Sequence, residues 1–347
     1  MRTLPFAVLL LGCGSTMVPS PGTDAGFDAG TDAGLDAGPP PPLPACAPDT
    51  PESLMGCVER ARYVTDLEAV EGARSPSDAH HDEVRDMIAT RLEALGLTVE
   101  RHDYGTGVNV IGTLAGTSDE RVLVSAHYDH IPDCPGADDN GSGVAGALEV
   151  ARVLAMATHD RTLVVAFWDE EERGLVGSEA YANRHATTGE PLVANLVFEM
   201  IGYRDETPNS QSFPDGFELL FPRQIRQIQA NQMRGDFILL IADELHSTAS
   251  VEAYQRMAAR VSLPAIALVL DDGNKRSPLL GDLRRSDHAP FWALDEPGVM
   301  IGDTANFRYA RYHCGAGADT SDHLDPDFSV QVIQATVGAA AELLANP

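Results

Sequence analysis

The chain has 347 residues with 24 basic and 52 acidic side chains, a formal net charge of −28 at pH 7. This excess of acid argues against nucleic acid or an anionic lipid surface as a partner, because both carry the same sign of charge. The balance instead suits a soluble protein outside the cytoplasm.

The N-terminus predicts an export signal that ends in a lipidated cysteine. Arg2 supplies a positive charge, residues 4–11 form a short apolar core, and Gly12 directly precedes Cys13. This apolar run is too short to span a bilayer as a mature helix. We expect a lipoprotein signal peptide over residues 1–13, with lipid on Cys13. An ordinary signal peptide with an incidental cysteine is the alternative.

Residues 14–45 form a predicted tether. They repeat an Asp-Ala-Gly unit and end in a run of prolines, so they contain almost nothing that could build a core. The remaining residues, 46–347, are within the range of one large domain. We expect an exported protein that is lipid-anchored at the bacterial cell envelope, or secreted if the anchor is not used. Its only membrane contact would be that anchor.

Apolar runs flanked by turn residues predict eight strands that are covered on both faces. They span residues 97–101, 108–114, 121–126, 162–168, 192–200, 237–242, 265–270 and 298–301. Helical patterns occupy 77–95, 143–155, 179–185, 247–261 and 328–344, with Ser77 as a possible N-cap. The alternation predicts an α/β three-layer sandwich, with helices on both faces of a mixed, mostly parallel, twisted sheet of about eight strands.

Acidic and histidine side chains gather in five segments, each of which is expected to lie where an apolar strand runs out into a loop. These are His127-Tyr-Asp129, Gly136–Gly143, Asp169–Ser178, Phe198–Gly202 and Tyr312-His313. In sheets of this kind, ligands bind outside the carboxyl ends of the strands. Two histidines with three or four carboxylates form a mixed nitrogen and oxygen set that suits zinc. The segments therefore indicate a metallohydrolase.

Each segment also has an ordinary explanation when it is taken alone. A His-x-Asp pair is common in surface loops, although Asp129 could accept the second imidazole N–H of His127. Asp139 or Asn140 could cap the following helix, but a cap does not explain Asp138 and Asp139 together. A solvated turn accounts for two of the four acids at 169–172. Four carboxylates at the end of a buried strand would repel one another without a cation.

From about His80 to its C-terminus, the chain resembles the co-catalytic di-zinc aminopeptidase family. That family includes secreted bacterial leucyl aminopeptidases and, more distantly, glutaminyl cyclases. The resemblance is carried by Gly-Ala-Asp-Asp-Asn-Gly-Ser-Gly at 136–143 and by Glu-Glu-Arg-Gly-Leu-Val-Gly-Ser at 171–178.

The resemblance implies a set of site residues. Two zinc ions would be held by His127, Asp139, Glu172, Glu199 and His313, with Asp139 bridging both. Glu171 would be the general base, and Tyr312 would hydrogen-bond the scissile carbonyl oxygen. Asp287 would lie beside the ligands without binding metal. The family usually has Asp where this chain has Glu199, and the loop after His313 is longer than usual.

The implied function is that of a zinc-dependent aminopeptidase acting on a peptide or small-molecule amide. Glu171 would take a proton from a metal-bound water and pass it to the leaving amine. One alternative is a glutaminyl cyclase-like acyltransferase with a single zinc, and another is a non-catalytic binding protein that retains a metal site. Tyr312 favours the hydrolase. The stretches 204–235 and 271–285 are expected to form the specificity pocket.

Four cysteines remain once Cys13 is assigned to lipid, which is compatible with two disulfides in an oxidising compartment. If the implied ligands share metals, the loops that carry Cys134 and Cys314 come together. We then expect Cys134 to pair with Cys314 and Cys46 with Cys57. Buried free thiols are the alternative.

Overall fold

The structure is a computed structural model that describes residues 39–345. The predicted signal peptide, Cys13 and most of the predicted tether lie outside the described residues. These described residues belong to one compact unit. Among the helices of residues 39–345, none is both long enough and apolar enough to cross a membrane.

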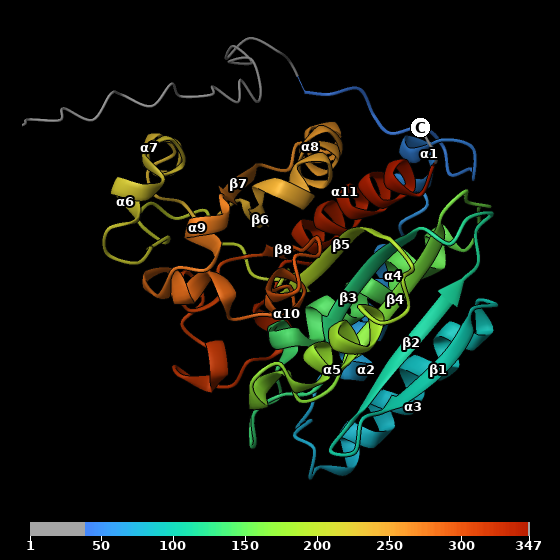
Figure 1. Cartoon of the computed structure of the whole chain (residues 1–347). Helices are drawn as coiled ribbons and strands as arrows, with labels where there is room; N and C mark the ends of the chain where they lie inside the picture. Colours follow the sequence, from blue (N-terminus) through green and yellow to red (C-terminus); the bar gives the residue numbers. More distant parts are fainter. Residues whose placement is uncertain (1–38, 346–347) are drawn as a thin grey trace, which may run out of the picture. The chain divides into compact units, whose positions relative to one another are not determined.

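Eight strands form one mixed sheet in the order β1-β2-β4-β3-β5-β8-β6-β7 (Figure 1). The strands are β1 (Thr98–Asp103), β2 (Val108–Leu114), β3 (Arg121–His127), β4 (Thr162–Trp168), β5 (Leu192–Glu199), β6 (Ile238–Asp243), β7 (Ala265–Leu270) and β8 (Val299–Gly302). The run β4-β3-β5-β8 is parallel, as is the pair β6-β7. The pairs β1-β2, β2-β4 and β6-β8 are antiparallel. The predicted fold class is confirmed.

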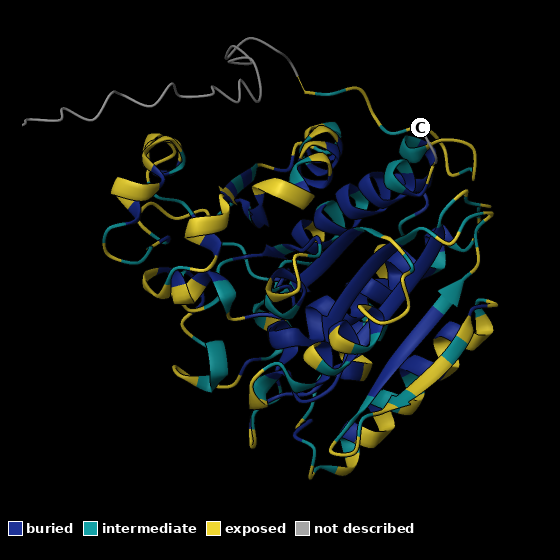
Figure 2. Ribbon diagram, viewed as in Figure 1, coloured by how far each residue is buried: buried dark blue, intermediate teal, exposed yellow. Residues whose placement is uncertain are grey.

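Successive residues of the central strands enter two different cores. In β3, Val122 and Val124 belong to the core on one face of the sheet, whereas Leu123 belongs to a core on the other face. In β4, Val165 and Val164 divide in the same way. This two-sided burial explains why the strands are apolar throughout. Figure 2 shows β3, β4 and β5 buried, while β1 is largely exposed at the edge.

Helices cover both faces of the sheet. One face packs against α2 (Arg60–Val70), α3 (Ala79–Ala94), α4 (Gly143–Leu154), α8 (Glu244–Arg260) and α11 (Pro326–Leu344), with α1 (Pro51–Met55) beside α11. The other face packs against α5 (Val176–His185), α6 (Phe217–Leu220), α7 (Pro222–Ala230) and α10 (Ala289–Ala293). The short α9 (Asp272–Lys275) follows β7. The expected cap at Ser77 is wrong: α3 begins at Ala79 after Asp78, whose carboxylate accepts from Ser75 instead.

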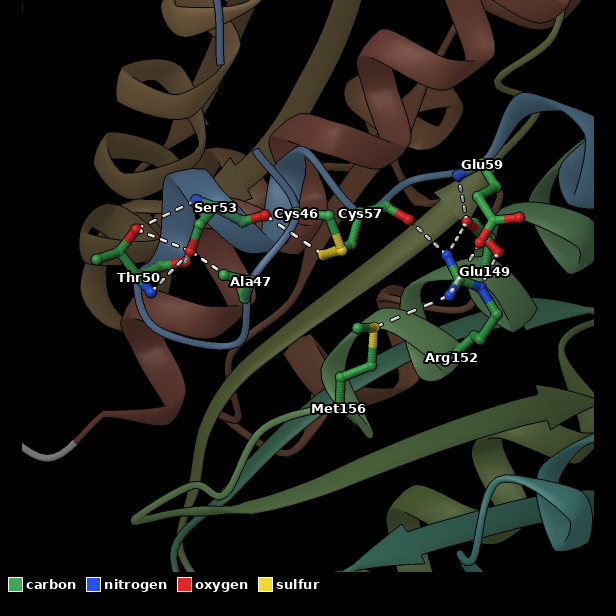
Figure 3. Close-up of a disulfide and its surroundings, with 9 residues drawn as sticks. All are labelled: Cys46, Ala47, Thr50, Ser53, Cys57, Glu59, Glu149, Arg152 and Met156. Carbon is green, nitrogen blue, oxygen red and sulfur yellow. Dashed lines mark hydrogen bonds and ion pairs between the residues drawn. A yellow bond between two sulfur atoms is a disulfide. The ribbon is translucent and has the colours of Figure 1, made fainter. Parts of the chain in front are cut away.

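The Cys46–Cys57 disulfide closes a short loop within the segment that precedes α2 (Figure 3). Between these cysteines, Thr50 and Ser53 form a reciprocal capping box that starts α1. Arg152 of α4 donates to the Cys57 carbonyl. The first part of the described chain is therefore tied to a helix of the main core.

Candidate metal centre

Sheet topology brings three of the predicted segments to one place. β4, β3 and β5 are adjacent and parallel, so their carboxyl ends lie at the same edge of the sheet. His127 is the last residue of β3, Glu199 is the last of β5, and Asp169–Glu172 directly follows β4. The polar residues that follow apolar strands in the sequence thus meet in space.

The glycine-rich segment supplies the next carboxylates. It forms a π-helical turn, Ala137–Ser142, that leads into α4, and the Asp139–Asn140 peptide is cis. The Asn140 side chain donates to the Phe198 carbonyl, which ties the turn to the end of β5. The Asp319 carboxylate accepts from the backbone amides of Asp138 and Asp139 at 3.0–3.1 Å. These bonds fix the Asp139 side chain beside the strand ends.

Asp139 lies between two groups of donor atoms. Its Oδ1 is 3.4 Å from Nε2 of His127, which is itself 3.6 Å from Oε2 of Glu199. Its Oδ2 is 3.1 Å from Nε2 of His313, which lies 3.1 Å from Oε1 of Glu172. The structure therefore brings together all five predicted ligands, with Asp139 facing both groups. Their roles as ligands stay predictions.

Several of these donor atoms are buried without a hydrogen bond. Within residues 39–345, His127 Nε2, Asp139 Oδ1, Glu172 Oε1 and His313 Nε2 have no partner of hydrogen-bond geometry. Burial opposes a charge on His313, but the nearby carboxylates of Asp139 and Glu172, each 3.1 Å from its Nε2, raise its pKa to about 10. The cluster of carboxylates therefore stabilises positive charge placed among its members. Converging orphaned nitrogen and oxygen donors fit zinc.

Glu171 lies next to these donors on a constrained turn. Its backbone amide donates to the Asp129 carboxylate at 3.0 Å, as the amide of Glu172 does at 3.2 Å. Glu170, the preceding residue, has a positive φ of 57°, which a non-glycine residue rarely adopts. Burial raises the pKa of the Glu171 carboxyl well above its usual value, against the lowering effect of His127.

Asp129 contacts His127 differently from the sequence expectation. The Nδ1 atom of His127 lies 3.2 Å from the backbone carbonyl oxygen of Asp129 and 3.5 Å from its carboxylate. That carboxylate is occupied by the amides of the Glu171 turn. Asp129 therefore orients the ring through its backbone and the turn through its side chain.

Tyr312 and Asp287 are both close to the centre. The Tyr312 ring stacks on His313, with centroids 3.9 Å apart, and its hydroxyl accepts from Arg285 at 2.9 Å. Asp287 is fully buried, and neither of its carboxyl oxygens has a hydrogen-bond partner in the described part of the chain. The nearby Ser178 hydroxyl donates to a backbone carbonyl instead. Burial raises the pKa of Asp287 to about 7.

Comparison with known proteins identifies the family. The model of peptidase family M28 matches residues 109–340, more than half of the chain. The chain belongs to peptidase family M28. Family membership confirms the expected enzyme class, a metallopeptidase, and the donor set fits zinc.

Two curated relatives show how far the likeness extends. The Escherichia coli K12 protein YfbL is 29% identical over 242 residues, covering 66% of this chain and 69% of its own length. A probable leucine aminopeptidase of Trichophyton verrucosum is 26% identical over 264 residues. That alignment covers 72% of this chain and 61% of the relative, so the chain matches less than two thirds of that relative.

Two solved structures share the fold. The LapA aminopeptidase of Legionella pneumophila superposes with a TM-score of 0.67 at 18% identity, covering 86% of this chain and 74% of its own. A glutaminyl cyclase of Porphyromonas gingivalis superposes with a TM-score of 0.57, also at 18% identity, covering 82% of this chain and 98% of the cyclase. At this identity both likenesses concern the fold alone.

An apolar cavity opens beside the metal centre of this M28 peptidase. It encloses about 870 Å³, its open mouth included, and it shares Glu199, Arg285 and Tyr312 with the cleft over the donor groups. Its apolar lining is Phe213, Pro214, Phe217, Ile225, Ile228, Phe237, Leu239, Ile241, Ile266, Leu268, Leu283, Ala305, Phe307 and Met300. Both stretches that were expected to form the specificity pocket, 204–235 and 271–285, contribute to this lining.

Sequence reasoning missed several residues around the donors. The fully buried Arg74 donates to the carbonyls of Tyr128, Gly136 and Asp139, so it holds the loop between two ligand segments. Within the described residues its side chain hydrogen-bonds only to backbone carbonyls, which a sequence motif does not reveal. Another missed residue is His130, whose Nδ1 lies 3.0 Å from Oε1 of Glu172. Its position three residues after His127 could have identified it from the sequence as a candidate site residue.

Proposed function

We propose that this M28 peptidase is an aminopeptidase that uses two zinc ions to remove the N-terminal residue from peptides. The observation that carries the proposal is the position of Asp139, whose two carboxylate oxygens face separate donor groups. His127, Asp139 and Glu199 would hold one ion, and Asp139, Glu172 and His313 the other. A carboxylate shared in this way is what a pair of adjacent metals requires.

Bound zinc would supply Lewis acidity that lowers the pKa of water and polarises the scissile carbonyl. Glu171 would act as the proton carrier. Its carboxylate takes a proton from the attacking water as the new C–O bond forms, and returns it to the amine nitrogen as the C–N bond breaks. Burial supports this role, because a carboxylate with a raised pKa is a stronger base.

Tyr312 would stabilise the charge that develops on the carbonyl oxygen. Its hydroxyl accepts a hydrogen bond from Arg285, which leaves its own proton free to point at substrate. The guanidinium of Arg285 increases the acidity of this hydroxyl and so strengthens the bond it can donate. Both residues line the cleft and the apolar cavity, so they lie between the reacting bond and the bound side chain.

The apolar cavity supports a preference for N-terminal residues with large apolar side chains. Its walls are aromatic and aliphatic, and it adjoins the donor groups through Glu199. An apolar side chain would gain about 25 cal/mol for each Å² that it buries there. The free amino terminus of the substrate would lie in the adjoining cleft, which is lined by Asp139, Glu171, Glu172 and Glu199.

The number of donor groups also distinguishes the two enzyme types that share this fold. A single-zinc acyltransferase would need one donor group, whereas this chain has two.

Export is supported by two disulfides within the described residues, since such bonds persist in oxidising compartments. We therefore propose an exported enzyme, anchored through Cys13 or secreted, with peptides as substrates and no nucleic-acid partner.

A substrate panel tests this function. Purified, zinc-loaded protein is given tripeptides with N-terminal Leu, Phe, Ala, Asp or Gln, each with a free or an acetylated amino group. We expect hydrolysis of the free Leu and Phe peptides at the first bond and none of the acetylated ones. Equal cleavage of acetylated peptides would contradict aminopeptidase action, and cyclisation of N-terminal glutamine would favour the acyltransferase.

A further inference from the structure

His130 is a buried imidazole that the proposed chemistry does not use. Its side chain has no solvent exposure, and neither ring nitrogen has a partner of hydrogen-bond geometry within residues 39–345. An unsatisfied polar group in the interior typically costs about 1–3 kcal/mol. A ligand bound to a ring nitrogen of His130 would remove this cost.

The Nδ1 atom of His130 points into the second donor group. It lies 3.0 Å from Oε1 of Glu172 and 3.9 Å from Oδ2 of Asp139. Nε2 of His313 lies 3.1 Å from each of the same two oxygens. Donor atoms around a tetrahedral zinc, with bonds of about 2.1 Å, lie about 3.4 Å apart. His130, Asp139 and Glu172 thus offer donor atoms that all lie within 4.8 Å of one another, and His313 reaches the same two carboxylates.

The surrounding structure holds the ring in this place. A Cβ at Gly136, where φ is +58°, would lie 2.6 Å from Cδ2 of His130, so the backbone packs closely on the ring. Arg74 fixes the carbonyls on both sides of the loop that carries His130. The Cys134–Cys314 disulfide joins the same loop to the residue after His313.

We propose that His130 is a fourth protein ligand of the second zinc. The two sites then differ in kind. The second, with His130, Asp139, Glu172 and His313, is closed by four protein donors, as structural zinc sites are. The first, with His127, Asp139 and Glu199, keeps a position open for water or substrate. One ion would be retained tightly, and the other would exchange more readily.

This inference rests on the proposed metal centre. X-ray absorption at the zinc edge distinguishes a wrong assignment of His130 from the absence of the centre itself. With the zinc-loaded full chain, we expect three imidazoles for every two ions. Two imidazoles for every two ions would overturn the role of His130 while leaving the centre intact. A protein that binds no zinc would overturn the centre and this inference together.

A variant gives a second, independent readout. In His130→Gln, the slowly released zinc should leave at least about 10–100-fold faster into an excess of chelator, and one imidazole should be lost. His185→Gln is the matched control, since His185 is also buried with an unpartnered Nε2 in the described chain but lies on α5, outside both donor groups. Equal release rates in the wild type and His130→Gln would refute the proposal. The imidazole count of the wild type decides the question if the variant fails to fold.

Discussion

Cys134 and Cys314 form a disulfide that spans 180 residues of sequence, with Cα atoms 5.9 Å apart. The pairing expected from the sequence is therefore present in the structure. Cys134 lies in the loop that leads to Asp139, and Cys314 directly follows His313. The bond thus joins two segments that each contribute a donor to the same side of the centre.

Removing this disulfide should weaken metal binding as well as folding. The chain-entropy model gives about 5 kcal/mol for a loop of this length and about 3 kcal/mol for the Cys46–Cys57 loop. We expect Cys134→Ser/Cys314→Ser to lower both the midpoint of chemical denaturation and zinc affinity. Cys46→Ser/Cys57→Ser, the control, should lower stability only. Equal zinc affinities in the two double variants would show that the long-range bond does not shape the centre.

Glu171→Gln should retain zinc but lose turnover, because an amide cannot accept the proton of the attacking water. A fall in kcat of about 10²–10⁴-fold is expected, with zinc content measured by elemental analysis. Glu170→Gln is a matched control at the neighbouring carboxylate, which binds Thr106 and Arg173 rather than facing the donor groups. Near-normal kcat in a zinc-replete Glu171→Gln protein would refute its assignment as the base.

Glu199 tests the donor group that contains His127. Glu199→Asp should be tolerated, since an oxygen donor remains, whereas Glu199→Ala should lower zinc content toward one ion per chain. Its Oε2 also accepts from Ser286 at 2.6 Å, so Ser286→Ala serves to separate loss of this hydrogen bond from loss of a ligand. Unchanged zinc stoichiometry in Glu199→Ala would show that this acid only ends a strand.

The apolar cavity can be tested by filling it. Met300→Trp should reduce kcat/KM for N-terminal Leu and Phe by about 10-fold or more and spare Ala, because loss of space penalises large side chains. Leu279→Trp, at a side chain that is 91% exposed and outside the cavity lining, should leave the ratio of Leu to Ala turnover unchanged. A uniform loss for all substrates in Met300→Trp would place the side-chain pocket elsewhere.

Strands were predicted more accurately than helices, for a physical reason. Seven of the eight strands are mainly apolar runs whose ends are marked by turn residues, whereas the edge strand β1 is mostly polar. All eight predicted ranges agree with the structure within two residues at each end. In contrast, α2 and α7 were not predicted. Each buries only two or three side chains, such as Ile225 and Ile228 in α7, so its apolar stripe is short.

The donor cluster could be inferred from the sequence only in part. Parallel strand ends meet at one edge, which is why His127 and Glu199 could be placed together from strand patterns. His313 could not, because it follows no strand and reaches the site through a turn with a φ of 51°. His130, Arg74 and Asp319 act through the folded shape of the loop at 128–139, which local patterns do not specify.

The central claim is that two zinc ions, shared by Asp139, hydrolyse the first peptide bond of a free N-terminus. Its most direct test is a titration: zinc is removed with a chelator, then returned in measured amounts while hydrolysis of Leu-Gly-Gly is followed. The account predicts no turnover without metal and a rate that reaches its plateau at two equivalents of zinc per chain. Full activity in the metal-free protein, or a plateau at one equivalent, would contradict it.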